Sequence, residues 1–217
     1  MATKTANPPV NDAADYFGVF GLPRKLELDR KALEQEFYKL SRKLHPDVFA
    51  RAPQAEQERA LEQSSRLNDA YRTLRDPIER TKYLLALEGV KLEEQSAGAT
   101  EQARTSGQEK KQAVPPELLE EVFELNLQLE EARMAKKTGE REGFNLAREL
   151  AQQKQIFEAK LAELEAELKA YWAEWDAGVA ASDDAKKAFA KVRMTDLLNR
   201  RSYIRNLVRD VNEVLEG

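Results

Sequence analysis

Two residue types that often carry out catalysis are scarce: the chain has one histidine, His45, and no cysteine. Without cysteine there is no disulfide, no thiolate nucleophile and no zinc–sulfur site. A metal site would depend on carboxylates alone, and a Ser–His–Asp site would need His45, which lies in no nucleophile-elbow pattern. The sequence therefore argues against a metal-dependent or nucleophilic enzyme, and it implies no cofactor and no metal.

His45 stands in the tripeptide His45-Pro46-Asp47, and the residues before it predict an amphipathic helix. Asp29 is a good N-cap residue for that helix. Apolar residues then recur at steps of three and four, at Leu33, Phe37, Leu40 and Leu44. Proline disfavours a helical conformation in the residue before it, so the helix must end near His45. The tripeptide is thus expected in a loop.

Three more helices are expected around this loop. A short one covers 15–20, a long one covers 54–74 until Asp76-Pro77 breaks it, and a last one covers 78–87 before Gly89. The two long helices, 29–45 and 54–74, would pack as an antiparallel hairpin. The expected core residues of this hairpin are Leu33, Phe37, Leu67, Tyr71 and Leu74.

A basic strip precedes the loop, because Lys39, Arg42 and Lys43 lie on the polar side of the helix. Such a strip can steer and dock an acidic partner surface, with His45 and Asp47 offering polar groups beside it. There is a plainer interpretation of each feature. Pro-Asp after a helix is an ordinary turn, a single histidine is often structural, and a basic helix face is often only solvated.

The flanking sequence resembles the J domain. FYKLSRKLHPD is followed by LNDAYRTLRDPIERTKY, which places Asn68-Asp69-Ala70-Tyr71 and the DPxxR element, Asp76 to Arg80, as J domains have them. The resemblance implies that His45, Pro46, Asp47, Lys39, Arg42 and Lys43 bind a DnaK-family chaperone and stimulate its ATP hydrolysis. That action is a coupling between sites and not chemistry by the J protein.

The whole chain is expected to be all-α, with a J domain joined to a C-terminal three-helix bundle. We expect a disordered tail at 1–12, the J domain at 13–92, a flexible polar linker at 93–114 and the bundle at 115–217. The bundle helices should begin at Pro115-Pro116, run over about 141–175, and begin again at Ser182 as a cap. A seven-residue seam marks the last helix, at Ala190, Leu197, Ile204 and Val211, and Arg201 interrupts it.

The first bundle helix carries two apolar stripes. Leu118, Val122, Leu125 and Leu129 form one, suited to the core, and Leu119, Phe123 and Leu127 form the other. Six glutamates and no basic residue fall between 117 and 131. An apolar stripe edged with one sign of charge suggests a partner site. The alternative is that both stripes are core and that the glutamates only offset basic residues of the last helix.

The opening DYF and FGLP, and the acidic helix followed by two more, resemble the HscB family of co-chaperones. A general DnaJ-like protein would need a Gly/Phe-rich segment and a cysteine-rich zinc region, which are missing. The resemblance implies an HscA-type chaperone as partner and a site for the iron–sulfur scaffold protein IscU. It places this site at Leu119, Glu120, Phe123, Glu124, Leu127 and Glu131, although LLEEVFELN departs from the commoner family pattern LMEQLELRE.

The function expected from this resemblance is that of a co-chaperone that stimulates an HscA-type ATPase and delivers IscU to it. Two alternatives stay open: a J protein that delivers another client, and a helical interaction protein with an inactive J domain. The net charge of −4 gives no sign of nucleic-acid binding. No apolar run approaches the length of a membrane span, and no signal peptide precedes the first helix, so a cytoplasmic protein is expected.

Overall fold

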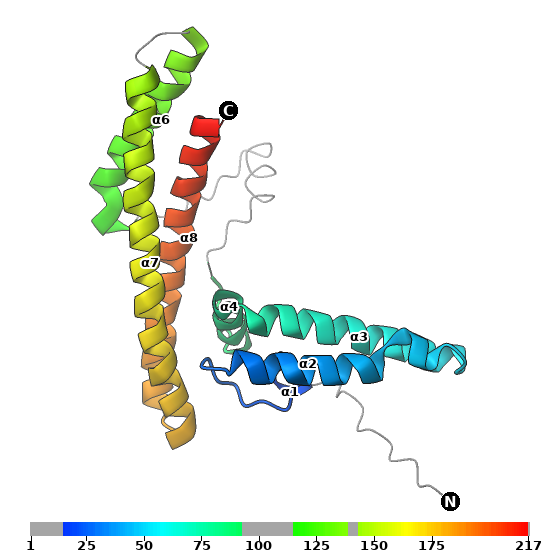
Figure 1. Ribbon diagram of the computed structural model, residues 1–217. Helices are drawn as coiled ribbons and strands as arrows, with labels where there is room; N and C mark the ends of the chain where they lie inside the picture. The colour runs from blue at the N-terminus through cyan, green and yellow to red at the C-terminus, as the bar shows by residue number, and fades with distance from the viewer. Residues whose placement is uncertain (1–14, 93–114, 139–142, 217) are drawn as a thin grey trace, which may run out of the picture. The chain divides into compact units, whose positions relative to one another are not determined.

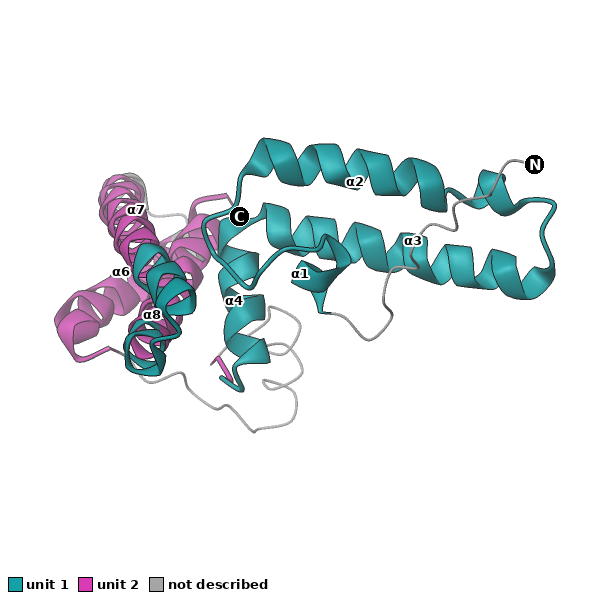
Figure 2. Ribbon diagram, turned by 90° about the horizontal axis from the view of Figure 1, so that it is seen from below, with its two compact units in different colours: residues 1–90, 172–190 teal, residues 91–171, 191–217 magenta. Residues whose placement is uncertain are grey.

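The computed structural model describes residues 15–92, 115–138 and 143–216, and every regular element in these ranges is helical (Figure 1). The all-α expectation is confirmed. The expected tail 1–12 and linker 93–114 lie outside the described residues. Two compact units make up the chain: Met1–Val90 with Trp172–Ala190, and Lys91–Tyr171 with Lys191–Gly217 (Figure 2).

The first unit contains the expected helical hairpin. Helix α2 (Arg30–Leu44) begins at Asp29, whose carboxylate accepts hydrogen bonds from the backbone N–H groups of Lys31 and Ala32 at 2.8 and 3.2 Å. Helix α3 (Gln54–Arg75) packs along α2, with the short helix α1 (Tyr16–Val19) also against it. Leu33, Leu67 and Leu74 are buried as expected, whereas Phe37 and Tyr71 are half-buried and stack on each other.

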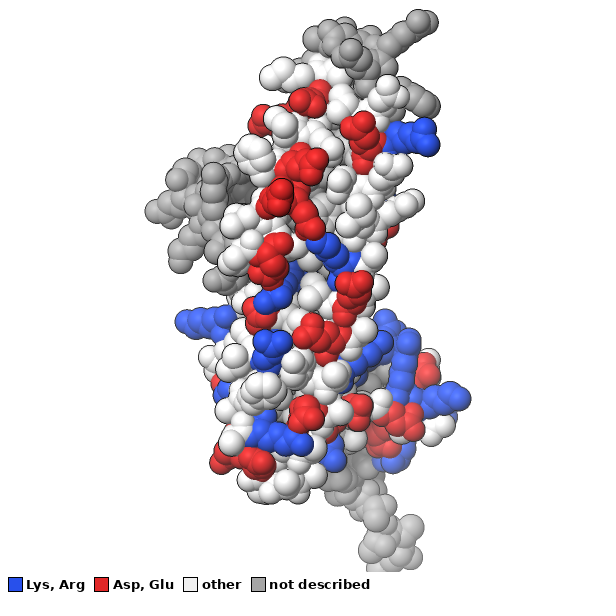
Figure 3. Space-filling model, turned by 90° about the vertical axis from the view of Figure 1, so that its left-hand side faces the viewer, with Lys and Arg blue, Asp and Glu red and all other residues white. Residues whose placement is uncertain are grey.

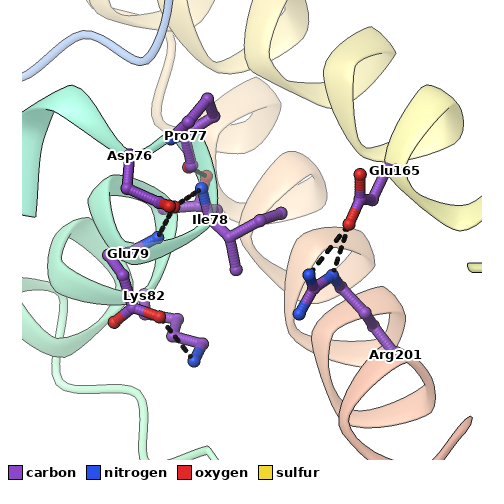
Figure 4. A network of polar contacts seen from close by, with 8 residues as sticks. Asp76, Pro77, Ile78, Glu79, Lys82, Glu165 and Arg201 are labelled. Atoms are coloured by element: carbon purple, nitrogen blue, oxygen red, sulfur yellow. Dashed lines mark hydrogen bonds and ion pairs between the residues drawn. The ribbon is translucent and has the colours of Figure 1, made fainter. Parts of the chain in front are cut away.

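Neighbouring residues of the chain form the break between α3 and α4 (Pro77–Leu87). Asp76 caps α4 by accepting hydrogen bonds from the N–H groups of Ile78 and Glu79 at 2.8 and 2.9 Å (Figure 4). Pro77 occupies the first position of the helix, where a missing N–H costs nothing. Gly89 ends it with a φ of 78°, a left-handed conformation that glycine adopts readily.

The ends of two later helices complete the first unit. Asp176 of α7 (Gly143–Ala181) is 9% exposed, and its carboxylate accepts hydrogen bonds from the backbone N–H groups of Leu26 and Glu27 at 2.8 and 2.9 Å. The indole N–H of Trp175 donates to the carbonyl oxygen of Arg24 at 3.0 Å. These contacts hold the loop that leads into α2. No sequence pattern near either partner predicts them.

Arg80, the arginine of the DPxxR element, is part of the same contact. It is buried, donates to the carbonyl oxygen of Leu74 at 2.5 Å, and lies over the ring of Trp172. Burial lowers the pKa of Arg80, while the nearby carboxylates of Asp176 and Asp76 act in the opposite direction. Asp176 thus compensates a buried cation as well as two backbone N–H groups.

The turn between α7 and α8 (Asp184–Glu216) differs from the expectation. Helix α7 continues to Ala181 instead of ending at Trp175, and Ser182 is not the cap, since its φ of 53° is left-handed. Asp183 caps α8 by accepting from the N–H of Lys186 at 3.0 Å. Its own N–H donates to the carbonyl oxygen of Gly178 at 2.9 Å, which closes the turn and leaves the left-handed position to Ser182.

The second unit is a bundle of α6 (Leu119–Thr138), preceded by the 3-10 turn η2 (Pro116–Leu118), with parts of α7 and α8. Its core joins Leu125 of α6 to Leu150 and Phe157 of α7 and to Ile204 and Val211 of α8. The seam expected along α8 is buried. Arg201, which interrupts it, holds Glu165 of α7 through two contacts of 2.9 and 2.8 Å (Figure 4), so it joins two helices at the edge of the core.

Candidate docking sites

The HPD strip, which comprises Lys39, Arg42, Lys43, His45, Pro46 and Asp47, lies on the surface of the first unit. His45 ends α2 with an extended backbone, and Pro46 starts the 3-10 turn η1 (Pro46–Phe49). The His45 Nδ1 accepts from the N–H of Asp47 at 3.3 Å, and the two side chains are 56% and 89% exposed. His45 is therefore not a core residue, and its imidazole faces outward together with a carboxylate.

The basic residues of the HPD strip are exposed as well. Arg42 and Lys43 lie in the last turn of α2, where their charge interacts favourably with the negative end of the helix dipole. Lys39 forms an ion pair with Glu36 at 3.0 Å, which the sequence analysis did not predict. This pair offsets part of the positive charge of Lys39. The strongest positive potential should therefore lie at the loop end of the strip.

Two exposed apolar side chains adjoin the HPD strip and escaped the sequence analysis. Tyr38 precedes Arg42 by four residues, so the two lie on one face of α2, close before its end at His45. Val48 follows Asp47 directly in η1 and is exposed too. The spacing of four residues between Tyr38 and Arg42 could have indicated in the sequence that Tyr38 belongs to this surface. Aromatic and arginine side chains together are typical of interface hot spots.

In the second unit, α6 packs only one of its two apolar stripes. Leu118, Val122, Leu125 and Leu129 are buried in the core. Leu119, Phe123 and Leu127 are 54%, 74% and 52% exposed. The alternative in which both stripes are core is therefore wrong for this helix. We call the exposed residues Leu119, Phe123 and Leu127, with Glu120, Glu124 and Glu131 beside them, the α6 ridge.

The glutamates at the start of and along α6 also fall into two groups, those paired with another helix and those on the exposed side. Glu117 pairs with Arg200 of α8 at 2.7 Å, and Glu121 pairs with Lys160 of α7. Both pairs hold the helix in one rotation about its axis. Glu120, Glu124 and Glu131 are exposed and take part in neither pair, and Glu117 is the glutamate that offsets a cation of α8. Figure 3 shows acidic side chains gathered on the upper part of the face that carries α6.

The described residues include a small cavity but no cluster of metal ligands. Across the described ranges, no group of three or more His, Asp or Glu side chains could hold a metal ion. A cavity of about 310 Å³ beside the start of α2 is lined mainly by apolar side chains, with Asp29 and Glu36 as its carboxylates. Among the helices of the described residues, none combines the length and the apolar character that crossing a bilayer demands. Both exposed surfaces are suited to binding proteins.

Comparison with known proteins assigns the N-terminal part of the chain to a class. Residues 15–83, which span α1 to the middle of α4, match the DnaJ domain family. The chain is therefore a J-domain protein, and the HPD strip lies inside the matched range.

The relatives extend the likeness beyond the J domain. The chain is 37% identical to a co-chaperone protein HscB homolog of Azoarcus sp. strain BH72 over 132 residues, which are 61% of this chain and 67% of the relative. It is 44% identical to a Vibrio cholerae homolog over 78 residues, 36% of this chain and 46% of the relative. The chain belongs to the HscB co-chaperone family, which agrees with the sequence analysis. The family is not one of enzymes.

Solved structures agree with this family over most of the chain. The chaperone HscB from Vibrio cholerae matches with a TM-score of 0.51 and 27% identity, covering 94% of this chain and 98% of its own. The human co-chaperone HscB shares the fold, with a TM-score of 0.56 at 21% identity, over 94% of this chain and 83% of its own. The expected architecture, a J domain followed by a helical C-terminal region, is confirmed.

Proposed function

We propose that the protein uses the HPD strip to stimulate ATP hydrolysis by an HscA-type chaperone of the DnaK family, and the α6 ridge to deliver the scaffold protein IscU to it. The observation that supports the proposed IscU site is that Leu119, Phe123 and Leu127 of α6 face away from the core of the bundle. A helix that buries one apolar stripe and exposes another, edged with glutamates, has a second surface with no use in its own core.

The chemistry of the HPD strip supports the first half. Exposed cations at the end of α2 steer an acidic surface into contact, and they raise the association rate more than they hold the complex. Pro46 limits the backbone freedom of the turn, so less conformational entropy is lost when His45 and Asp47 engage. Stimulation then arises because docking favours the chaperone conformation that hydrolyses ATP.

The α6 ridge calls for a different kind of partner surface. Phe123 and the two leucines bury apolar area on binding, which contributes affinity roughly in proportion to that area. The exposed glutamates beside them favour a partner whose apolar patch is bordered by Lys or Arg. In this proposal, IscU is the protein that presents such a patch.

Single-turnover ATP hydrolysis by an HscA-type chaperone tests the proposal. We expect stimulation by the protein, a further rise when IscU is added, and no stimulation by the His45→Gln variant. A Phe123→Ala, Glu124→Ala double variant should stimulate without IscU as the unaltered protein does, but should lose the IscU-dependent rise. Val192→Ala, the truncation of another exposed apolar side chain, on α8, is the control and should behave as the unaltered protein.

The outcomes separate the two halves. Stimulation that needs His45 but ignores IscU would keep the chaperone partner and reject this client, so that the ridge would bind another protein. Equal stimulation by the unaltered protein and by His45→Gln would reject the role of the HPD strip.

A further inference from the structure

The α6 ridge continues beyond Leu127. Successive residues of an α-helix are rotated by about 100°, so Phe123 and Leu127 lie at about 40° and 80° from Leu119 around the axis. Met134, fifteen residues after Leu119, lies at about 60°, between these two directions. Its side chain is 69% exposed. The apolar side chains of the ridge therefore extend along about 22 Å of helix, at 1.5 Å per residue.

Acidic residues lie along the same length of α6 as the apolar side chains. Glu120, Glu124 and Glu131 lie at about 100° to 140°, along one edge of the apolar side chains. Glu130 lies at about 20°, one turn before Met134, and is exposed as well. The end of the ridge near Met134 thus repeats the combination of an exposed apolar side chain and carboxylates that is found around Phe123.

We propose that Met134 is a fourth apolar anchor of the α6 ridge, and that oxidation of its thioether by a peroxide weakens binding of the scaffold protein. This inference rests on the proposed function. Met134 alone among the four anchors carries an oxidisable group, since the others are leucine and phenylalanine. Met194, on α8, is fully buried and is shielded by the core.

The reaction balances without a further reactant. The Sδ of Met134 attacks one oxygen of hydrogen peroxide, the O–O bond breaks as the S–O bond forms, and the second oxygen leaves as water after proton transfer. Sulfur is oxidised by two electrons and the peroxide is reduced. The sulfoxide is polar, so its burial against an apolar patch is no longer favourable.

The experiment compares three proteins before and after oxidation. Each full-length protein is treated with hydrogen peroxide, freed of it by catalase and desalting, checked by intact mass and circular dichroism, and then titrated with untreated IscU by calorimetry. We expect oxidation of the unaltered protein to raise its Kd about tenfold, the order expected from losing one anchor. Met134→Leu should bind with its original affinity before and after peroxide, and Met134→Gln should bind about tenfold more weakly without any peroxide.

Two results would overturn the inference: an equal loss of binding by Met134→Leu after peroxide, or unchanged affinity of Met134→Gln. In both cases the Phe123→Ala, Glu124→Ala double variant shows whether the proposed function survives. If it binds IscU weakly, the ridge remains the site and ends before Met134. If the unaltered, unoxidised protein does not bind IscU at all, the proposed function fails together with the inference.

Discussion

The HPD strip and the α6 ridge present opposite chemistry and arise in different ways. The strip is basic and polar, and a single helix end and a four-residue turn form it. The ridge is apolar and acidic, and it is exposed only because the rest of the bundle holds α6 in one rotation. A surface formed by one helix end and the next turn can be recognised from its sequence motif. A surface formed by one side of a packed helix depends on which side the remaining helices bury.

The supports of the two surfaces differ as well. The unit that carries the HPD strip has, beside its apolar core, a contact centred on the nearly buried carboxylate of Asp176. The unit that carries the ridge depends mainly on apolar packing between three helices. The two surfaces should therefore respond differently to substitution, salt and pH.

The largest effect is expected from Asp176→Ala. It leaves the buried N–H of Leu26 and the part-buried N–H of Glu27 without their acceptor and removes a carboxylate near the buried Arg80, which should cost about 3–5 kcal/mol of stability in the first unit. Both tryptophans of the chain, Trp172 and Trp175, lie at this contact, so their fluorescence during urea unfolding reports on it. Asp176→Asn, which keeps an acceptor, should lose less. A variant Asp176→Ala as stable as the unaltered protein would show that the contact does not support the unit.

Two adjacent leucines test whether α6 really separates core from ridge. Leu118→Ala removes a buried side chain and should cost about 2–5 kcal/mol in the free energy of unfolding. Leu119→Ala should change that free energy by less than about 0.5 kcal/mol, because the side chain is exposed. Binding of IscU should show the reverse order, with the folded Leu119→Ala variant weakened. Equal destabilisation by both substitutions would mean that the ridge is part of the core.

Salt should affect the two surfaces unequally. Arg42→Gln removes an exposed charge of the HPD strip, so it should weaken chaperone binding by about 1 kcal/mol at low ionic strength and by less at high ionic strength. Phe123→Ala should weaken IscU binding by a similar amount at every salt concentration, because apolar burial is not screened. Titrations across a salt series check both. A salt-independent effect of Arg42→Gln would refute electrostatic docking.

The smallest effect concerns pH. Partial burial raises the pKa of Asp15, but hydrogen bonds from Gly18 N–H and Arg24 lower it more, so the pKa lies below its ordinary value. A depressed carboxyl pKa stabilises the fold at neutral pH, and this contribution is lost as the pH falls through the folded-state pKa. Asp15→Asn keeps a capping oxygen, so it should lose less than about 1 kcal/mol at neutral pH.

That difference between Asp15→Asn and the unaltered protein should disappear in acid below the pKa of Asp15, as measured by urea unfolding at a series of pH values. A difference that stays constant down to about pH 2 would show that the charge of Asp15 does not contribute.

Local features were open to prediction because neighbouring residues determine them. Asp29 caps its helix as expected, Asp76-Pro77 separates two helices as expected, and Pro46 ends α2 at the expected place. These effects act within one turn of chain, where the identity of a residue and its position are enough. The J-domain motif belongs to this class, and so does the seven-residue seam of α8.

The tertiary structure decided what distant residues contribute. Asp176 binds Leu26 across 150 positions of sequence, and nothing near either residue indicates the other. The N-cap expected at Ser182 lies at Asp183 instead, because Gly178 and Asp183 close the turn between the two helices.

The sequence by itself determined that the protein is helical, that it carries a J domain and that α6 has two apolar stripes. Only the packed structure decided which stripe faces outward. Both stripes have apolar side chains at helical spacing, so their composition alone does not distinguish them. The choice comes from the core around Leu125 and from the ion pairs of Glu117 and Glu121, which require three helices to be in place.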